Sequence, residues 1–397
     1  MKLLVLTSRF PYPLEKGDKL RIFNQIRELS RQHEIILCAL TEEIVQDADY
    51  QQVMPFCSQI HVFHLSKITI FLNILGGILR GLPFSVSYFF NKKIQRQILD
   101  IAAREKPNHV YAQLIRTSEY FKETTYPKTL DYMDAFSIGM KRRSQDDAWF
   151  LRLFYALESK LLRRYETTIF AYYNHLTIIS QQDKLLMIGN EDINIKVVPN
   201  GIDYQYFTPN YEQKVQPIYD IVFVGNLGYY PNIQAAKYLV NQILPLLKKE
   251  YPNIKILLAG ARPSQEIELL ANENVNIKRD LVDIREAYLA AKIFAAPIFH
   301  GSGQQNKILE AMAMGLPCIT TTLVNNAILA KPNEEILTAD TEGAFVEQIK
   351  NLLQDIDYQL IIKANGREFV KTHYSWHTAT QVLNDLMENK YTLAQPN

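Results

Sequence analysis

The chain has 397 residues, of which 47% are hydrophobic, and 43 Lys and Arg balance 42 Asp and Glu to a formal net charge of +1. This length predicts between two and three domains of about 150 residues, and the balanced charge argues against nucleic acid as a partner. The three cysteines, Cys38, Cys57 and Cys318, fit neither a disulfide framework nor a zinc site and favour a reducing compartment. The first residues do not form a signal peptide, so we expect a cytoplasmic protein.

Short apolar runs bounded by polar turns recur along the first half of the chain and predict buried strands. They begin at Lys2, Glu34, His61, His109, Lys128, His175 and Ile195. Segments of helical periodicity lie between them, and one of them follows Gly17 with apolar residues at positions 22, 23, 26 and 29. Alternating strands and helices predict a parallel sheet covered on both faces.

A second series of predicted strands follows the segment from Thr208 to Pro217, whose proline and polar residues are typical of an interdomain linker. These runs begin at Asp220, Lys255, Lys292, Pro317 and Glu335. The sequence therefore predicts an α/β chain with two doubly wound domains. Such domains bind ligands at the carboxyl ends of their strands, so the functional residues are expected in the loops that follow strands.

The window from Tyr50 to Leu99 contains no acidic residue. Its basic residues are Lys67, Arg80, Lys92, Lys93 and Arg96. Its longest apolar run, Ile68 to Leu79, is shorter than the ~20 residues that span a bilayer. An apolar and basic surface binds anionic lipid, which predicts peripheral contact with the inner face of the cell membrane through Lys67–Lys93. The alternative is a buried helix with solvated Lys and Arg at its ends.

The segment from Ile298 to Thr322 carries the clearest chemical pattern. A predicted strand ends at Ile298, and a glycine-rich turn follows whose N–H groups would cradle a phosphate at the start of a helix. Asn306, Lys307 and Glu310 share one face of that helix, where a lysine neutralises phosphate and a carboxylate accepts two ribose hydroxyls. The alternative is a surface helix with an ordinary Lys–Glu pair.

Two nucleotide-binding patterns are missing from the sequence. Asn306 stands where a GxGxxG fingerprint needs its third glycine, and GxxxxGK occurs nowhere in the chain. These absences argue against a dehydrogenase and a nucleoside triphosphatase.

Several motifs resemble glycosyltransferase family four, which has the GT-B fold of two Rossmann-like domains facing a central cleft. They are VVPNGIDYQYFTP from Val197, LEAMAMGLP from Leu309 and REFVKTHYSWHTA from Arg367. The chain is closer still to a subgroup of sugar transferases of exopolysaccharide systems. The motifs of that subgroup are SRFPYPLEKGDKLRIFNQI from Ser8, FVGNLGYYPNIQAA from Phe223 and GQQNKILEAMAMG from Gly303.

The resemblance implies a glycosyltransferase that moves a sugar from a nucleotide diphosphate sugar to a hydroxyl of a glycan or lipid-linked acceptor. It further implies retention at the anomeric carbon, no metal or other cofactor, and a role in cell-surface or exopolysaccharide biosynthesis. The acceptor-side domain would cover residues 1–203 and the donor domain residues 204–374, with a helix over 375–397 packed back on the first domain. Two alternatives are a GT-B nucleotide-sugar epimerase and a non-catalytic sugar-nucleotide-binding component of a polysaccharide assembly complex.

The resemblance also assigns roles to residues. Lys307 would stabilise the diphosphate during catalysis and Glu310 would bind the ribose. The other expected donor-binding residues are Gly17, Asn226, Arg262, Gly301, Ser302, Gly303, Gln304, Gln305 and Asn306. For Gly17 the alternative is an ordinary turn glycine before a helix.

The chain departs from the family at two places. Ser302 replaces the first of two glutamates, and Asn226 and the tyrosines after it stand where most members have an Arg and a Lys. Lys307 is therefore the main candidate for neutralising the diphosphate. Arg262 is the second candidate, with a solvated loop residue as the alternative.

In the first domain, Asp131 and Asp134 lie at the end of a predicted strand, where many family members have a catalytically relevant His. Asp134, the nearest polar equivalent, is the second candidate catalytic residue: it would orient an acceptor hydroxyl or the donor sugar, or alternatively cap a helix. Glu158 and Glu166 lie on a helix rich in Lys and Arg, which favours a solvated, salt-bridged face over a site.

Overall fold

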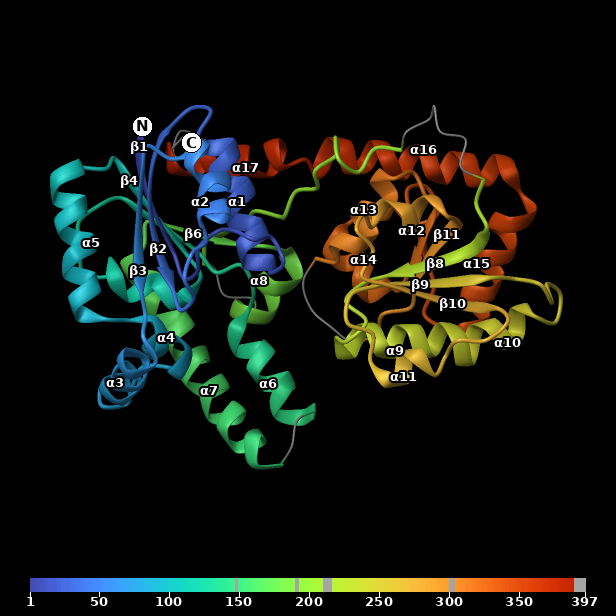
Figure 1. The fold of residues 1–397 in the computed structure, drawn as a ribbon, viewed down its shortest axis with the longest axis horizontal. Helices are drawn as coiled ribbons and strands as arrows, with labels where there is room; N and C mark the ends of the chain where they lie inside the picture. Colours follow the sequence, from blue (N-terminus) through green and yellow to red (C-terminus); the bar gives the residue numbers. More distant parts are fainter. Residues whose placement is uncertain (147–148, 190–192, 210–215, 300–303, 389–397) are drawn as a thin grey trace, which may run out of the picture. The chain divides into compact units, whose positions relative to one another are not determined.

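The computed structural model describes residues 1–397 except 147–148, 190–192, 210–215, 300–303 and 389–397. It divides into two compact units, residues 1–199 with 379–397 and residues 200–378. Each unit is a parallel sheet with helices packed around it, as Figure 1 shows. The described residues of the predicted linker, 208–209 and 216–217, lie within the second unit.

The first unit contains a seven-stranded parallel sheet in the order β3-β2-β1-β4-β5-β6-β7. Its strands are β1 (Lys2–Thr7), β2 (Glu34–Thr41), β3 (Gln59–His64), β4 (His109–Gln113), β5 (Lys128–Asp131), β6 (His175–Ile178) and β7 (Ile195–Val197). Its helices are α1 (Gly17–Leu29), α2 (Asp47–Val53), α3 (Lys67–Ile78), α4 (Phe84–Phe89), α5 (Lys92–Glu105), α6 (Phe136–Asp146), α7 (Trp149–Thr168) and α8 (Gln181–Ile188). Three short 3₁₀ helices are η1 (Met54–Phe56), η2 (Ile115–Tyr120) and η3 (Ile169–Tyr172).

The second unit contains a six-stranded parallel sheet in the order β10-β9-β8-β11-β12-β13. Its strands are β8 (Tyr219–Val224), β9 (Ile256–Gly260), β10 (Val275–Arg279), β11 (Ala291–Ala296), β12 (Cys318–Thr320) and β13 (Leu337–Thr338). Its helices are α9 (Tyr230–Tyr238), α10 (Leu244–Leu247), α11 (Gln265–Glu268), α12 (Arg285–Leu289), α13 (Asn306–Ala313), α14 (Thr322–Ile328), α15 (Glu342–Gln354) and α16 (Ile356–His373), with the π-helical turn η4 (Leu239–Ile243). A last helix, α17 (Trp376–Met387), runs from the second unit into the first.

Both sheets have the strand order of a doubly wound Rossmann-like domain, in which the direction of winding reverses next to the first strand. The reversal falls between β1 and β4 in one unit and between β8 and β11 in the other. Loops at the carboxyl ends of these strands diverge there and leave room for a ligand. The predicted fold class, two doubly wound α/β domains, is confirmed.

Alternation along the strands explains how both faces of the first sheet are covered. Leu4 and Leu6 of β1 pack into a core with α5, whereas Leu3 and Val5 pack on the opposite face with α1. Leu383 of α17 belongs to this second core, so the end of the chain completes the first unit.

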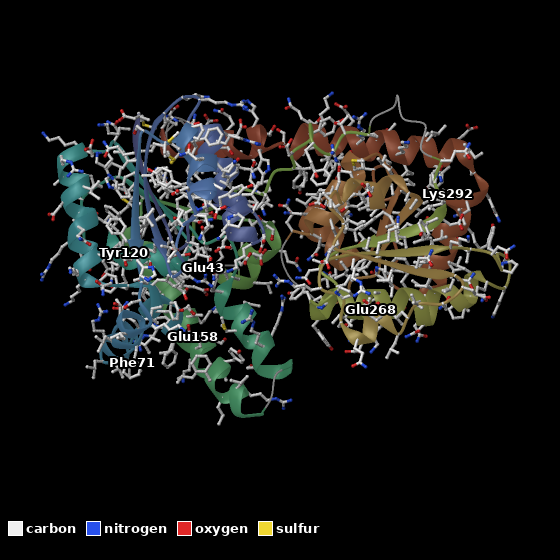
Figure 2. The ribbon with its side chains drawn as sticks, viewed as in Figure 1. Glu43, Phe71, Tyr120, Glu158, Glu268 and Lys292 are labelled. Carbon is white, nitrogen blue, oxygen red and sulfur yellow. The ribbon has the colours of Figure 1, made fainter. Side chains whose placement is uncertain are left out.

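The long apolar run in the acid-free window forms α3, and most of its side chains are exposed. In the parts of the chain that are described, no helix is long and apolar enough to cross a membrane. We call the exposed apolar residues of this segment the α3 face: Ile68, Phe71, Leu72, Leu75, Ile78 and Leu79. Leu79 is 89% exposed and Ile68 76% exposed, and Phe71 is labelled in Figure 2. The alternative of a buried helix is wrong for α3, because only Ile70 and Gly77 of that helix are buried.

Candidate functional site

In the second unit, Lys307 lies at the start of α13, beside the carboxyl end of β8. Its Nζ donates a hydrogen bond to Gln305 Oε1 at 2.7 Å. Its stem lies against Gly225, where an added Cβ would come within 3.3 Å of Lys307 Cε and 2.9 Å of Asn232 Nδ2. Because Gly225 has no side chain, the lysine stem can lie against the backbone at this end of the sheet.

Glu310, one turn along α13, is held by a buried tyrosine. The Tyr288 hydroxyl donates to Glu310 Oε2 at 2.8 Å, and Tyr288 itself is fully buried. Burial raises the pKa of Glu310, opposed by the Tyr288 hydrogen bond and by Lys307. Burial also lowers the pKa of Lys307 to about 8, opposed by Glu310.

Lys307 and Glu310 do not form the ordinary surface pair of the alternative interpretation. Both are partly buried, and no ion pair within 4.0 Å joins them in the described structure. The neighbours Ile308, Leu309 and Ala311 are in the core. The Lys307 ammonium group is therefore partly withdrawn from water without a direct contact to a carboxylate. A bound anion would stabilise the charged form of such a group.

The loops after β8 and β9 approach each other closely beside this lysine. Gly260 has φ +148° and lies so near the Gly225 carbonyl that a Cβ would stand 1.7 Å from that oxygen. Asn226 shapes the first loop, because its Oδ1 accepts from Gly228 N at 3.0 Å and its carbonyl accepts from Asn232 Nδ2 at 2.9 Å. Asn226 thus orders the loop in this structure, and its side-chain oxygen is already engaged.

Arg262 lies in the loop after β9 with a φ of +54°. Its backbone carbonyl lies close to Gly228, because a Cβ added at Gly228 would be 2.7 Å from that carbonyl oxygen. The side chain is exposed. Within the described ranges no hydrogen bond or ion pair engages its guanidinium. The structure is thus compatible with either interpretation of Arg262, a second cation for the diphosphate or a solvated loop residue.

The residues just before α13 have different surroundings. Gln304 exchanges two hydrogen bonds of 2.9 Å with the backbone of Asn200 and so ties this segment to the chain that follows β7. Asn306 has a buried Oδ1 with no hydrogen-bond partner in the described structure. Gly301, Ser302 and Gly303 lie outside the described residues.

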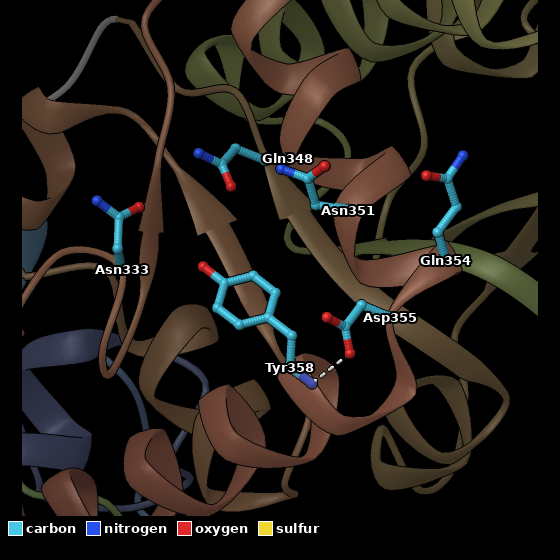
Figure 3. Close-up of a pocket in the computed structure, with 6 residues that line it drawn as sticks. All are labelled: Asn333, Gln348, Asn351, Gln354, Asp355 and Tyr358. Atoms are coloured by element: carbon cyan, nitrogen blue, oxygen red, sulfur yellow. Dashed lines mark hydrogen bonds between the residues drawn. The ribbon is translucent and has the colours of Figure 1, made fainter.

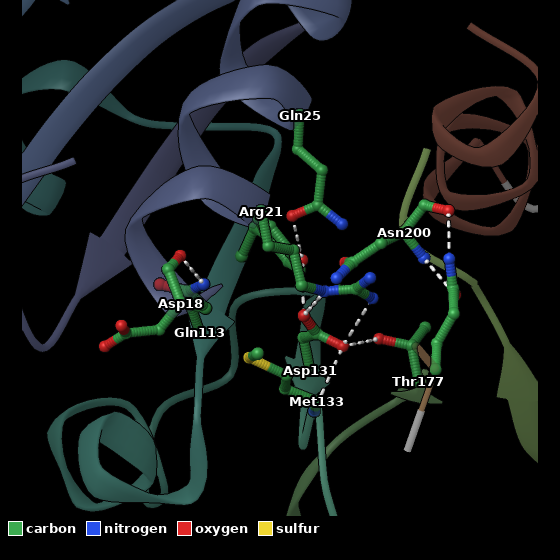
Figure 4. Close-up of polar contacts among 10 residues, drawn as sticks. Asp18, Arg21, Gln25, Gln113, Asp131, Met133, Thr177 and Asn200 are labelled. Atoms are coloured by element: carbon green, nitrogen blue, oxygen red, sulfur yellow. Dashed lines mark hydrogen bonds and ion pairs between the residues drawn. The ribbon is translucent and has the colours of Figure 1, made fainter. Parts of the chain in front are cut away.

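In the first unit, Asp131 belongs to a buried ionic network at the carboxyl end of β5 (Figure 4). Arg21 binds it through two nitrogens, Nε to Oδ2 at 2.7 Å and Nη2 to Oδ1 at 3.0 Å. The Thr177 hydroxyl donates to Oδ1 at 2.8 Å and the Tyr111 hydroxyl to Oδ2 at 3.1 Å. Arg21 and Asp131 are both fully buried, so Asp131 links α1 to the sheet and its oxygens are occupied.

Asp134, three residues further on, has a different environment. Burial and the nearby Asp183 raise its pKa to about 7, against the opposing effect of Arg21. In the described part of the chain its carboxyl group makes no hydrogen bond. Asp134 is thus a carboxyl group at the end of β5 with a pKa raised to about 7, and its carboxylate form can accept a hydrogen bond from a hydroxyl group.

The start of α6 is capped by residues other than Asp134. Glu166 accepts from the backbone N–H of Ser137 at 2.9 Å and from that of Phe136. Asp183 accepts from the Ala135 N–H. The alternative of Asp134 as a helix cap is therefore wrong, because distant carboxylates satisfy these amides.

The expectation that Glu158 and Glu166 are solvated is also wrong. They are 1% and 0% exposed. Glu158, labelled in Figure 2, accepts from the backbone N–H groups of Phe84 and Ser85, both at 2.8 Å, and so caps α4. The two glutamates hold α4 and α6 to α7 through helix N-termini, where a carboxylate is favourable.

Gly17 is the first residue of α1, and a Cβ there would lie 3.3 Å from Met133 Cε. The neighbouring Asp18 pairs with Arg9, and its carbonyl accepts from Gln113 Nε2 at 2.8 Å. Gly17 thus lies in the first unit beside the loop that follows β5. Met133, which it approaches, directly precedes Asp134 in the sequence.

A separate polar hollow lies over α15 and α16 and contains none of the predicted site residues (Figure 3). Asp355 Oδ1 there accepts from Tyr358 N at 2.8 Å and caps α16. Its remaining lining residues are Asn333, Gln348, Asn351 and Gln354. Among the described residues, no group of three His, Cys, Asp or Glu side chains is placed to hold a metal ion.

Comparison with known proteins identifies the fold and a family match. Two Rossmann-like units in one chain form the GT-B architecture, and the chain superimposes on HepE of Anabaena, solved with UDP and glucose, with a TM-score of 0.68 and 14% identity. That match covers 98% of this chain and 100% of HepE. Residues 218–355 match the family model Glycosyl transferases group 1. The fold is thus the GT-B fold, and the second unit matches the glycosyltransferase family model, as the motifs predicted.

Two curated proteins are similar in sequence. An uncharacterized 44.6 kDa protein in the cps region of Klebsiella pneumoniae is 24% identical over 396 residues, 94% of this chain and 96% of that protein. A UDP-Gal:alpha-D-GlcNAc-diphosphoundecaprenol alpha-1,3-galactosyltransferase of Escherichia coli is 25% identical over 179 residues, 39% of this chain and 44% of that protein.

Proposed function

We propose that this glycosyltransferase moves a sugar from a nucleotide diphosphate sugar to a hydroxyl of a glycan or lipid-linked acceptor in polysaccharide biosynthesis. The observation that carries the proposal is the partly buried Lys307, which forms no ion pair within 4.0 Å with the nearby Glu310 at the carboxyl end of the second sheet. A diphosphate supplies the negative charge that this lysine lacks, and Glu310 is one helical turn away for the ribose hydroxyls.

Relatives support the choice of donor and pathway. HepE was solved with UDP and with UDP-glucose, and the E. coli relative is named for UDP-Gal. The Klebsiella relative lies in a cps region. UDP-hexoses are therefore the first donors to test, with residues 200–378 as the donor-binding unit and the first unit as the acceptor side.

In the proposed mechanism the leaving diphosphate accumulates negative charge as the glycosidic bond breaks. Lys307 and the N–H groups at the start of α13 stabilise that charge, which preorganised cations and dipoles do without further reorganisation. We propose retention at the anomeric carbon and no metal requirement. The diphosphate oxygen takes the acceptor proton, and Asp134 orients the acceptor hydroxyl.

The direct test is incubation with UDP-hexoses with and without an acceptor. Transfer predicts sugar on the acceptor together with UDP release, in the presence of EDTA as well as in its absence. Change of the sugar without any acceptor would instead identify an epimerase. Nucleotide binding with no turnover across a donor and acceptor panel would indicate a non-catalytic component.

We further propose that the α3 face contacts an anionic membrane. Its exposed side chains provide apolar area, and Lys67 and Arg80 flank it in a window without acidic residues. Each basic residue near an anionic surface contributes about 1 kcal/mol. Phe71→Glu with Leu72→Glu should abolish flotation with phosphatidylglycerol vesicles, while the matched pair Leu360→Glu and Ile361→Glu, exposed apolar residues of the second unit, should not. Wild-type flotation that is independent of anionic lipid would refute this contact.

A further inference from the structure

Arg116 is a half-buried arginine, and among the described residues no carboxylate lies within ion-pair distance of it. It lies in η2, just after β4, and its guanidinium stacks between two rings, with Cζ 5.2 Å from the centroid of Phe89 and 4.8 Å from that of Phe136. Its Nε is buried and has no hydrogen-bond partner, and no ion pair to it is found among the described residues. A guanidinium that is partly withdrawn from water between two rings binds an anion more favourably than a fully solvated one does.

The charged groups around Arg116 leave it uncompensated. The charge of Arg9 lowers the pKa of Arg116, whereas Asp18, Asp134 and Glu42 raise it without forming an ion pair with it in the described structure. Two of these three carboxylates are engaged elsewhere: Asp18 pairs with Arg9 at 2.5 Å, and Glu42 accepts from the Tyr88 hydroxyl at 2.6 Å. Burial consequently lowers the pKa of Arg116 to about 10, which still leaves it cationic at neutral pH.

The position of Arg116 in the fold suits a substrate. Arg9 follows β1, Arg116 follows β4 and Asp134 follows β5, so all three lie at the carboxyl edge of the sheet, next to the reversal of strand order. Ligands of doubly wound domains bind at this edge. An anion here would lie beside the first strand and near the carboxyl group that titrates close to neutral pH.

An apolar surface is close to this cationic position. Phe89, which stacks on Arg116, belongs to α4, and α4 packs against both η2 and α3. The exposed α3 face is therefore separated from Arg116 by one short helix. A molecule with an anionic head and a hydrocarbon chain would satisfy both features, its head at Arg116 and its chain toward the α3 face.

We propose that Arg116 binds the phosphate or diphosphate of an isoprenoid-linked acceptor and so positions the acceptor sugar. This rests on the proposed function, because it names the acceptor class for the same reaction. The anionic group remains attached throughout: the acceptor hydroxyl attacks the anomeric carbon, the sugar–diphosphate bond breaks, and the charge at Arg116 is unchanged. Arg116 is thus a positioning residue.

The test measures binding of farnesyl diphosphate, below its critical micelle concentration, to the full chain by calorimetry. Wild type should bind it more tightly than farnesol or inorganic pyrophosphate. Arg116→Gln should weaken it at least tenfold and leave the Kd of UDP within twofold. Arg116→Met keeps an apolar side chain between the rings of Phe89 and Phe136, so its melting temperature should equal that of wild type. It should weaken binding as much as Arg116→Gln does, which distinguishes loss of the charge from a folding defect. Arg367→Gln is the matched control, because Arg367 also stacks on an aromatic ring, that of Tyr204, but lies in the second unit.

Each other outcome overturns the proposal. Wild-type affinity for farnesyl diphosphate in both Arg116 variants would show that Arg116 does not bind the anion. An equal loss of UDP affinity would assign Arg116 to the donor. Equal affinity of wild type for pyrophosphate and farnesyl diphosphate would indicate a free phosphate site with no lipid. If wild type binds no nucleotide at all, the proposed function fails, and the farnesyl diphosphate measurement still decides the role of Arg116.

Discussion

The pKa of Lys307 gives a quantitative prediction for donor binding. Burial holds that pKa at about 8 in the empty site, whereas its ordinary value is 10.5. A bound diphosphate favours the protonated amine and should return the pKa to the ordinary value or above it. The difference corresponds to about 3 kcal/mol of interaction between the diphosphate and the charged lysine.

Because the empty site loses its proton above pH 8 and the occupied site keeps it, UDP binding takes up a proton in alkaline solution. The Kd should be nearly constant below pH 8 and should rise about tenfold between pH 7 and pH 9. Calorimetry at pH 7, 8 and 9, in buffers of different ionisation enthalpy, measures both the affinity and the proton uptake. The same linkage makes the empty protein more stable as pH rises from 8 toward 10.5, since the unfolded chain then binds more protons.

Substitutions at Lys307 separate this effect from ionisation of uracil, which also occurs in alkaline solution. Lys307→Arg keeps the charge and should remove the lysine contribution to the pH dependence. Lys307→Ala should lower turnover by an amount of order 10²-fold or more. Equal steepness of the pH dependence in wild type and Lys307→Arg would refute the reasoning, as would wild-type turnover in Lys307→Ala.

Three other sites give independent predictions. Glu310→Ala should weaken UDP binding by about 1.5–3 kcal/mol, because a charged hydrogen-bond acceptor for the ribose is lost. Tyr288→Phe should weaken it by less, because only the hydrogen bond that positions Glu310 is lost. Unchanged calorimetric affinity in Glu310→Ala would exclude Glu310 from the donor site. Asp134→Asn should lower kcat without changing the Kd of UDP, and wild-type turnover should rise with pH through about 7 as the carboxylate forms; an unaltered pH profile in the variant would exclude this role. Because folding raises the pKa of Asp134 from 3.8 to about 7, the folded protein loses stability as pH rises from about 4 to 7 and keeps that loss at higher pH, so Asp134→Asn should melt higher than wild type at pH 8 and about equally at pH 4. Asp131→Ala should destabilise the chain by about 3–5 kcal/mol in urea unfolding, because it leaves Arg21 buried without its partner; a loss below 1 kcal/mol would contradict the buried network.

The strands and their order of winding were predictable because buried parallel strands are nearly continuous apolar runs. The exception is β10 (Val275–Arg279), which is not among the predicted strands. Its side chains alternate between apolar and polar, Val275 and Ile277 with Asn276 and Lys278 between them, because it is an edge strand with one solvated face. Apolar continuity does not find such a strand.

The polar interior was less predictable. Glu158 and Glu166 were expected in solvent because Lys and Arg surround them in the sequence. The structure buries both, since their partners are backbone amides of α4 and α6 that lie 73 or 74 and 29 residues away along the chain. A sequence pattern reports neighbours on one helix and contains no signal for a carboxylate that caps another.

The same limit applies to the candidate site. The spacing of Lys307 and Glu310 placed them on one face of a helix, but their burial depends on Tyr288 and Gly225, which come from other elements. Arg116 was missed because nothing adjacent in sequence marks it. Its stacking partners Phe89 and Phe136 lie on α4 and α6 and meet it only in the fold.

The measurement that tests the central claim most directly is transfer of labelled hexose from UDP-hexose to an isoprenoid-diphosphate-linked sugar. The account predicts labelled lipid-linked product and stoichiometric UDP, both dependent on added acceptor and both lost in Lys307→Ala. Release or rearrangement of the hexose at the same rate without acceptor, or undiminished transfer by Lys307→Ala, would contradict it.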